Sequence, residues 1–206
     1  MELSAIEFFG TLRTDETAAA MRRKLLSEEE ERRRHGEFRL CDDRPFWGIL
    51  SYLSEECGGN VHLKGIVNIT SSSDDRNKCH QVTDYGWNDY WRTKDEEDSW
   101  ICFDFKDKTV RLTKYSVKSG GCHYLHDWVI EGSNDGCLWK GLDWHRMECV
   151  KEYYITNTYE CGGLLESLFS KGFRYLRVRE IGNPSLGSVL SLSAIEFFGT
   201  LHSVAK

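Results

Sequence analysis

The sequence predicts an all-β fold, an antiparallel β-sandwich preceded by a helical linker. Short runs rich in β-branched and aromatic residues recur from Val61 onward. Turn signals separate these runs, the clearest being Asn134-Asp135-Gly136, with further breaks at Gly120-Gly121 and Gly162-Gly163. Little helical sequence lies between the runs, whereas parallel strands would need crossover helices. These observations favour two packed antiparallel layers.

The predicted strands are residues 61–70, 100–105, 110–117, 128–132, 173–179 and 192–198. The run 100–105 has the clearest alternation, because Ile101, Phe103 and Phe105 share one face of an extended chain. Cys102 and Asp104 share the other face. We therefore expect Ile101, Phe103 and Phe105 to be in the core.

Residues 13–37 are predicted to form a charged helical linker. Thr14 or Asp15 can cap the helix and Gly36 can end it. Acids precede arginines by four residues, in the pairs Glu28/Arg32, Glu29/Arg33 and Glu30/Arg34. The thin apolar stripe, Met21, Leu25 and Leu26, predicts a solvated spacer that docks lightly on its neighbour.

An identical segment of ten residues, LSAIEFFGTL, occurs at residues 3–12 and again at residues 192–201. Because the second copy falls on the last predicted strand, we interpret residues 1–12 as the terminal strand of a preceding repeat. The sandwich domain is then residues 38–206, and the chain is a tandem repeat fragment. The orphan strand could lie against the domain, be disordered, or complete a neighbouring sandwich by strand exchange.

The net charge of −6, from 27 basic and 33 acidic residues, gives no general attraction to nucleic acid or to anionic lipid. No run is long enough for a membrane-spanning helix, and the first residues lack the features of a signal peptide. We read the eight cysteines as free thiols of a cytoplasmic protein. Disulfides are the alternative if an export signal is missing.

Four segments in order resemble the discoidin domain (coagulation factor V/VIII type C), a galactose-binding-like jelly roll. They are TDYGWNDYWRTKDEEDSWICFDF at 83–105, VRLTKYSVKS at 110–119, WVIEGSNDGCLW at 128–139, and FRYLRVRE at 173–180 followed by LSAIEFFG. The resemblance is closest to an intracellular subgroup and implies a jelly-roll β-sandwich that binds without catalysis. It also implies that Trp91, Trp100, Trp128 and Trp139 pack the sandwich. We further predict an ion pair between Asp104 and Arg177.

The resemblance implies that ligands meet loops at one end of the sandwich. By position these loops are residues 93–98, 119–123 and 71–80. The candidate ligand residues are Asp74, Asp75, Trp87, Asp95, Glu96, Glu97, Asp98 and His123. The acidic tips would repel an anionic bilayer and carry no apolar side chain to insert, so we expect no membrane insertion.

An acidic rim suits a basic protein segment or a cation. Calcium is one option, although the spacing does not match an Asp-x-Asp-x-Asp-Gly loop and a solvated loop is the simpler interpretation. The aromatics Tyr85, Trp87 and Tyr90 could stack on a sugar or a peptide, or pack the end of the barrel.

Sequence signatures of catalysis are missing, including G-x-S-x-G, Walker and H-E-x-x-H motifs. Two Cys-His couples, Cys79-His80 and Cys122-His123, are poorly arranged for a shared zinc ion. We therefore expect no enzyme activity, no cofactor and no metal. The preferred function is intracellular protein binding, such as substrate recruitment, and the alternative is a carbohydrate-binding, lectin-like module. A hydrolase with dispersed catalytic residues is a third option.

Overall fold

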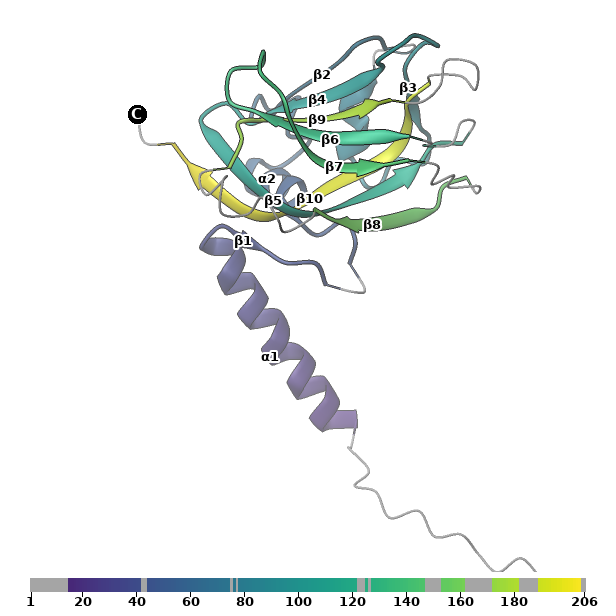
Figure 1. Cartoon of the computed structure of the whole chain (residues 1–206). Coiled ribbons are helices and arrows are strands. Elements are labelled where there is room, and N and C mark those ends of the chain that lie inside the picture. The colour runs from purple at the N-terminus through teal and green to yellow at the C-terminus, as the bar shows by residue number, and fades with distance from the viewer. Residues whose placement is uncertain are drawn as a thin grey trace, which may run out of the picture.

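A computed structural model describes residues 15–41, 44–74, 76, 78–121, 125, 127–146, 153–161, 172–181 and 189–204. Two antiparallel sheets face each other, and a long helix projects from them (Figure 1). The first sheet has the order β1 (Glu37–Phe38), β10 (Ser191–Ser203), β5 (Lys108–Ser119), β8 (Thr156–Glu160), and β3 (Trp91–Arg92) also pairs with β10. The predicted antiparallel β-sandwich is confirmed.

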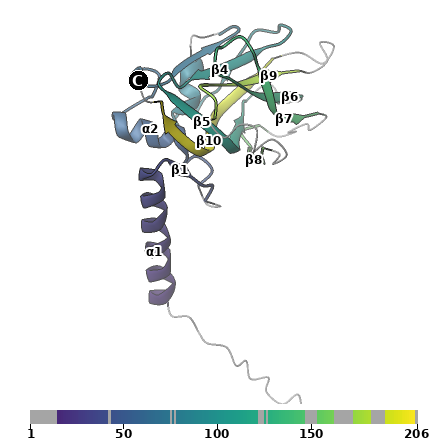
Figure 2. The same ribbon diagram turned by 60° about the vertical axis from the view of Figure 1, so that its left-hand side comes forward.

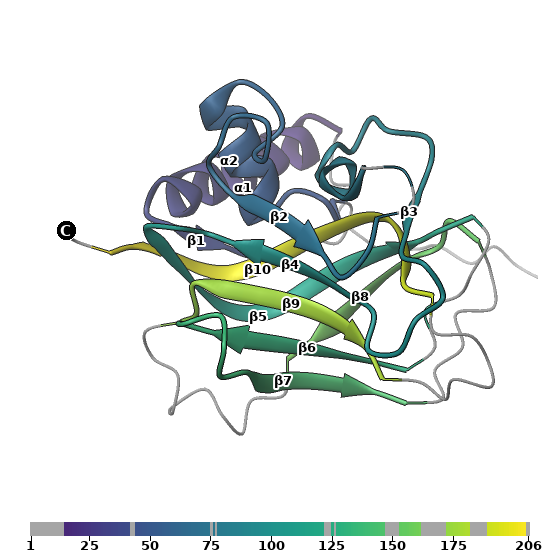
Figure 3. The same cartoon turned by 90° about the horizontal axis from the view of Figure 1, so that it is seen from above.

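The second sheet has the order β2 (Asn68–Ser71), β4 (Trp100–Asp104), β9 (Tyr175–Glu180), β6 (Trp128–Ser133), β7 (Lys140–His145). Figure 3 shows these five strands side by side over the first sheet. Residues 61–67 form turns and not the predicted start of a strand. The sequence analysis did not predict β1, β3, β7 and β8. Of these, β1, β3 and β8 have five residues or fewer, and β7 has no clear alternation of buried and exposed residues.

The core lies between the two sheets. Ile101, Phe103 and Phe105 are fully buried, as the alternation predicted, and the Phe103 ring meets the Phe197 ring edge-on at 5.1 Å. Trp91 and Trp128 are also buried in the core. Each such aromatic side chain removes a large apolar area from water.

Two predictions for the second sheet were wrong. Trp100 and Trp139 are only half-buried and are not part of the core. Trp139 instead lies under the guanidinium of Arg177, 3.9 Å from the ring centroid.

The predicted Asp104–Arg177 ion pair does not form. The β4–β9 register places Arg177 opposite Cys102, two residues before Asp104, and places Tyr175 opposite Asp104. Asp104 pairs with Arg174 through two hydrogen bonds of 2.7 and 2.9 Å, and Arg177 pairs with Glu131 at 2.7 Å. Strand register, which the sequence does not reveal, decides these partners.

A second helix, α2 (Ile49–Cys57), packs against β10 and was not predicted from the sequence. Its N-terminus has no side-chain cap of its own. The Glu196 carboxylate on β10 supplies one, because it accepts hydrogen bonds from the backbone N–H groups of Gly48, Leu50 and Ser51 at 2.8 to 3.1 Å. Because the cap comes from a distant strand, the local sequence gave no signal for the start of this helix.

The helix α1 (Asp15–Arg34) is the predicted linker, and its first turns project away from the sandwich (Figure 2). Arg33 anchors its last turn: the guanidinium donates to Trp47 O at 2.8 Å and to Glu55 Oε2 at 3.2 Å, and lies 4.1 Å from the Trp47 ring centroid. Met21 and Leu25 are 51% and 56% exposed. Glu29 and Arg33 near the end of the helix are buried, whereas of the thin apolar stripe only Leu26 is half-buried.

No helix in the described ranges is long and apolar enough to span a membrane. The six cysteines within those ranges are free thiols. Burial raises the pKa of Cys102 and of Cys161 to about 12, so neither thiol is activated at neutral pH.

Candidate ligand-binding end of the sandwich

The predicted ligand loops meet at one end of the sandwich, which we call the loop end. The connections β2–β4, β5–β6, β7–β8 and β9–β10 all reach it. Backbone hydrogen bonds tie the connections to one another, for example Glu180 N–H to Ser99 O at 2.8 Å and Ile181 N–H to Asp127 O at 2.7 Å. The described part of this end is therefore a connected surface built from segments distant in sequence.

The acidic loop 93–98 lies at this end, as expected, but part of its charge is used within the molecule. The Asp98 carboxylate accepts a 2.7 Å hydrogen bond from Arg179, which also pairs with Glu131. Hydrogen bonds from Ser73 and Ser72 lower the pKa of Glu96. Asp95 and Glu97 are exposed.

Two other predicted residues have structural contacts. The Asp74 carboxylate accepts hydrogen bonds from the backbone N–H groups of Arg76, Lys78 and Cys79, and caps the short helix η1 (Cys79–Thr83). Burial opposes its ionisation, but these hydrogen bonds outweigh burial and lower the pKa of Asp74. Trp87 is half-buried against the core.

Of the other residues predicted near the ligand, two are not described and one has a structural role. Asp75 and His123 lie outside the described residues. The Tyr85 hydroxyl donates to Glu196 Oε2 at 2.9 Å and its ring stacks on Phe46, so Tyr85 belongs to the α2 capping site. Of the three predicted aromatic residues, Tyr85, Trp87 and Tyr90, only Tyr90 has its described contacts at the loop end.

Tyr90 and Tyr154 form an aromatic pair at the loop end, with ring centroids 6.4 Å apart and planes at 64°. Gly121 fits against both rings: a Cβ there would lie 2.3 Å from the Tyr154 hydroxyl and 3.0 Å from Tyr90. Ser119 fixes the neighbouring backbone, because the N–H of Ile155 donates to its hydroxyl at 3.1 Å. The position of the tyrosine pair is therefore set by three connections: the one before β3, the one after β5 and the one before β8.

Charged side chains border this pair. The Arg76 guanidinium lies 5.9 Å from the Tyr90 ring centroid and pairs with Asp89 at 3.3 Å. The Lys118 ammonium lies 5.7 Å from the Tyr154 ring centroid. We call these residues the two-tyrosine cluster: Arg76, Asp89, Tyr90, Lys118, Gly121 and Tyr154.

The cluster is open to solvent and its backbone is strained at one point. Tyr154 is 42% exposed, and the side chains of Arg76 and Asp89 are 48% and 40% exposed. Tyr154 has φ +58°, a left-handed conformation that non-glycine residues adopt at a cost of about 1 kcal/mol or more. Strain of this kind is concentrated at functional sites.

Known structures share this architecture. The module CpGH89CBM32-5 from Clostridium perfringens, solved with GalNAc-β-1,3-galactose, is 14% identical, with a TM-score of 0.51 over 66% of this chain and 96% of that one. The CBM32 of AlyQ, solved with 4,5-unsaturated mannuronic acid, is 17% identical, with a TM-score of 0.51 over 65% of this chain and 95% of that one. The fold is a discoidin-like jelly roll of the galactose-binding-like type. No protein-family profile matches the sequence.

The jelly roll explains why the sequence located the loop end but missed Tyr154. The family resemblance fixed the order of the strands and therefore which connections share an end. The segment before β8 lies outside the four segments that resemble the discoidin family. The adjacent aromatic residues Tyr153 and Tyr154, just before the strand residues that begin at Thr156, could have indicated an aromatic surface. Both are more than 40% exposed.

Metal ligation has no support in the described part of the jelly roll. No three His, Cys, Asp or Glu side chains come together there as a metal site. Cys79 and His80 lie in η1, and the second predicted couple, Cys122-His123, is outside the described residues.

Proposed function

We propose that this jelly roll is a non-catalytic carbohydrate-binding module that holds a saccharide on the two-tyrosine cluster. The observation that carries the proposal is an aromatic pair at the loop end, in which Tyr154 is exposed and Tyr90 half-buried, bordered by charged hydrogen-bonding groups. Two structures with the same fold support it. CpGH89CBM32-5 from Clostridium perfringens was solved with a disaccharide, and the CBM32 of AlyQ was solved with 4,5-unsaturated mannuronic acid. These likenesses support the proposal by analogy of fold.

The chemistry of the cluster suits a sugar. A tyrosine ring offers an apolar face for the C–H side of a pyranose and a hydroxyl for hydrogen bonding. Arg76, Asp89 and Lys118 can exchange hydrogen bonds with sugar hydroxyls, and such bonds are strengthened by the charge. The arrangement positions a ligand and offers no reacting group.

The structure also gives a reason to prefer a saccharide over a basic protein segment. A basic partner would need the acidic loop, but Asp98 is paired with Arg179 and Asp74 is hydrogen-bonded to three backbone N–H groups. The charge that the loop offers to a partner is correspondingly reduced. Tyr90 and Tyr154, in contrast, are not part of the hydrophobic core.

A glycan array followed by titration calorimetry on the best saccharide tests this function. We expect Tyr154→Ala and Tyr90→Ala each to weaken binding about tenfold, which corresponds to losing about 1.4 kcal/mol of aromatic contact with the sugar. Tyr175→Ala is the matched control, because Tyr175 lies at the opposite end of the sandwich beside Trp139. It should bind as the wild type does.

Two outcomes would count against the proposal. The array could give no saccharide that free sugar displaces, or the control variant could lose binding as strongly as the two cluster variants. A basic peptide whose binding falls on replacing Asp95 and Glu97 by Asn and Gln would support protein recruitment instead. Circular dichroism of each variant confirms that the sandwich is intact.

A further inference from the structure

A connected group of polar and aromatic side chains joins the two sheets just below the loop end. Trp128 Nε1–H donates to the Tyr115 hydroxyl at 3.0 Å, and this hydroxyl donates to Asp143 Oδ2 at 2.9 Å. His145 Nε2 lies 2.6 Å from the same oxygen, and its ring stacks on Trp128 with the centroids 4.4 Å apart and the planes at 15°. Together with Tyr159 of β8, these four residues form what we call the histidine cage.

Three aromatic rings surround the imidazole of His145. Besides the stacked Trp128 ring, the Tyr159 ring lies 4.3 Å away and the Tyr115 ring 6.4 Å away, measured between centroids. Tyr115 and Tyr159 are opposite each other in the β5–β8 register, so both rings come from the first sheet. The His145 side chain is only 12% exposed. Ring faces at these distances attract a cation, and that of tryptophan does so most strongly.

The carboxylate of Asp143 also favours a charged His145. Burial and this carboxylate raise the pKa of Tyr115 well above its ordinary value, so the Tyr115 hydroxyl keeps its proton and donates it to Asp143. Among the described contacts of Asp143, His145 is the only group that can carry a positive charge. Burial alone would favour neutral His145, but it would leave the negative charge of Asp143 without a counter-ion. The imidazolium form satisfies both groups with a charge-assisted hydrogen bond.

Two further titratable groups face the cage within the described residues, Cys161 after β8 and Glu180 on β9. Burial and the nearby carboxylate raise the pKa of Cys161 to about 12, so it stays a neutral thiol. Glu180 is buried and lies opposite Trp128 in the second sheet. Neither group adds a positive charge that would oppose a proton on His145. Arg146, the next residue along the chain, is exposed, so water and salt screen its charge.

The cage ties β8 to the second sheet close to Tyr154. β8 ends the order of strands in the first sheet and begins two residues after Tyr154. Its Tyr159 ring contacts His145 on β7, which belongs to the second sheet. Between them, Ile155 is hydrogen-bonded to Ser119 through both its N–H and its carbonyl. The left-handed backbone of Tyr154 therefore depends on the anchoring of the start of β8.

We propose that His145 is a positioning residue that carries its proton at neutral pH, and that its charge keeps β8, and with it Tyr154, in the saccharide-binding arrangement. The part concerning saccharide rests on the function proposed above. Because the fold favours the protonated form, its contribution is complete below about pH 6.5, where the histidine of an unfolded chain is also protonated. The contribution is lost as the pH rises through the titration midpoint of folded His145.

Titration of His145 tests its charge and needs no saccharide. In NMR spectra of the full chain, we expect the ring signals of His145 to titrate with a midpoint above about pH 6.5, the value of an unperturbed histidine. The indole N–H signal of Trp128 should shift with the same midpoint. Asp143→Asn removes the counter-ion and should lower the midpoint by about one pH unit or more. A wild-type midpoint at or below about pH 6.5 overturns the inference.

Hydrogen exchange tests the positioning. The Ile155 N–H reports on the segment between Tyr154 and β8, because it is hydrogen-bonded to Ser119. Its protection, corrected for the intrinsic pH dependence of exchange, should fall at least about tenfold when the pH passes the His145 midpoint. His145→Gln keeps a side-chain N–H but cannot be charged, so this step should vanish. A step that survives in His145→Gln would mean that another group is responsible.

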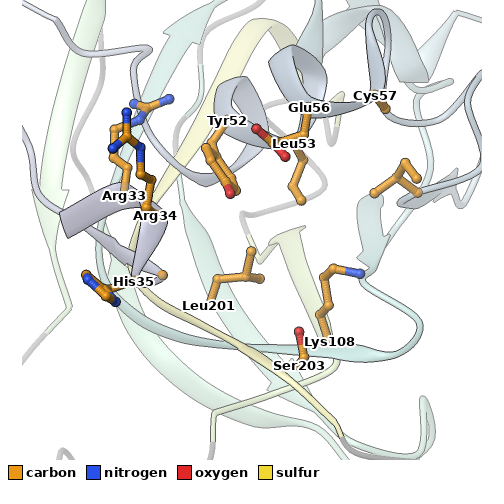
Figure 4. A pocket seen from close by; sticks show the side chains of 12 residues that line it. Arg33, Arg34, His35, Tyr52, Leu53, Glu56, Cys57, Lys108, Leu201 and Ser203 are labelled. Atoms are coloured by element: carbon orange, nitrogen blue, oxygen red, sulfur yellow. The ribbon is translucent and has the colours of Figure 1, made fainter. Parts of the chain in front are cut away.

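His35→Asn is the matched control. His35 also lies beside a carboxylate, that of Glu31 at 3.3 Å, but it is 74% exposed. It borders a cavity of about 700 Å³ at the opposite end of the sandwich, where Lys108 and Ser203 also lie (Figure 4). The step in Ile155 protection should remain in this variant, and its loss would contradict a specific role for His145.

The affinity for saccharide then links the cage to the binding site. With the best saccharide from the array, the wild type should bind at least about threefold more weakly above the His145 midpoint than below it, and His145→Gln should bind equally at both pH values. Equal pH dependence in the two chains would overturn this link. Absence of saccharide binding at every pH would instead refute the proposed function alone, because the NMR and exchange results do not depend on a ligand.

Discussion

At the scale of single residues, Glu196 links β10 to the start of α2, which is 146 residues away in the case of Leu50. Its carboxylate accepts the N-terminal N–H groups of α2 and the Tyr85 hydroxyl. A charge in the middle of the apolar run LSAIEFFGTL would be taken from sequence for a solvent-facing strand position. The helix dipole and five donors, the fifth being the backbone N–H of Phe197, make the burial of Glu196 tolerable instead.

Replacing Glu196 by Ala should lower the free energy of unfolding by about 3 kcal/mol or more, because several buried donors lose their acceptor together. Glu196→Gln should cost less, because its amide oxygen still accepts from the helix N-terminus. Urea denaturation followed by fluorescence measures both. Equal losses in the two variants would show that the carboxylate does not act as the cap.

Strand register at this scale also limits what sequence can predict. The sequence predicted that Asp104 pairs with Arg177. The antiparallel register instead pairs Asp104 with Arg174, and Glu131 with both Arg177 and Arg179. Neighbours across strands depend on the alignment of whole strands. Composition and spacing do not contain this information.

At the scale of elements, long strands with clear alternation were predictable and short ones were not. β4, β5, β6, β9 and β10 each overlap a predicted strand. β3 has two residues and depends on pairing with β10 for its conformation. The helix α2 depends on an acid from β10. Elements stabilised mainly by tertiary contacts leave little trace in local sequence.

The docking of α1 gives an element-scale prediction. Arg33→Ala should release the last turn of α1 and increase its amide hydrogen exchange at least tenfold, since Arg33 holds the Trp47 carbonyl, the Glu55 carboxylate and the Trp47 ring. Arg34→Ala is the matched control, because the Arg34 side chain is 72% exposed and pairs only within the helix in the described contacts. Its exchange should match the wild type. Unchanged exchange in Arg33→Ala would place the docking elsewhere.

At the scale of the whole molecule, the class of fold could be predicted but the candidate site could not. Turns, alternation and family resemblance are spread along the chain and reinforce one another. The two-tyrosine cluster is assembled from the connections that precede β3, follow β5 and precede β8. Only the folded arrangement brings Tyr90 and Tyr154 to Gly121.

Removing residues 1–12 should leave the thermal midpoint of the wild-type chain nearly unchanged. Both neighbours of β10, β1 and β5, already have their partner within residues 37–203. Differential scanning calorimetry checks this, and a chain that ends at residue 190 serves as the positive control because it lacks β10 and should not fold. A large drop on removing residues 1–12 would mean that the first copy belongs to this sandwich.

The points where the sandwich is attached to other segments have a consequence for avidity. β10 ends, and α1 leaves, away from the loop end (Figure 1). If the two-tyrosine cluster binds a saccharide, as proposed above, copies of the sandwich in a tandem array joined through α1 would all keep their clusters uncovered. Weak contacts with single sugars in such an array would combine on a polyvalent glycan and raise the apparent affinity by about 10²–10⁴ without any new contact.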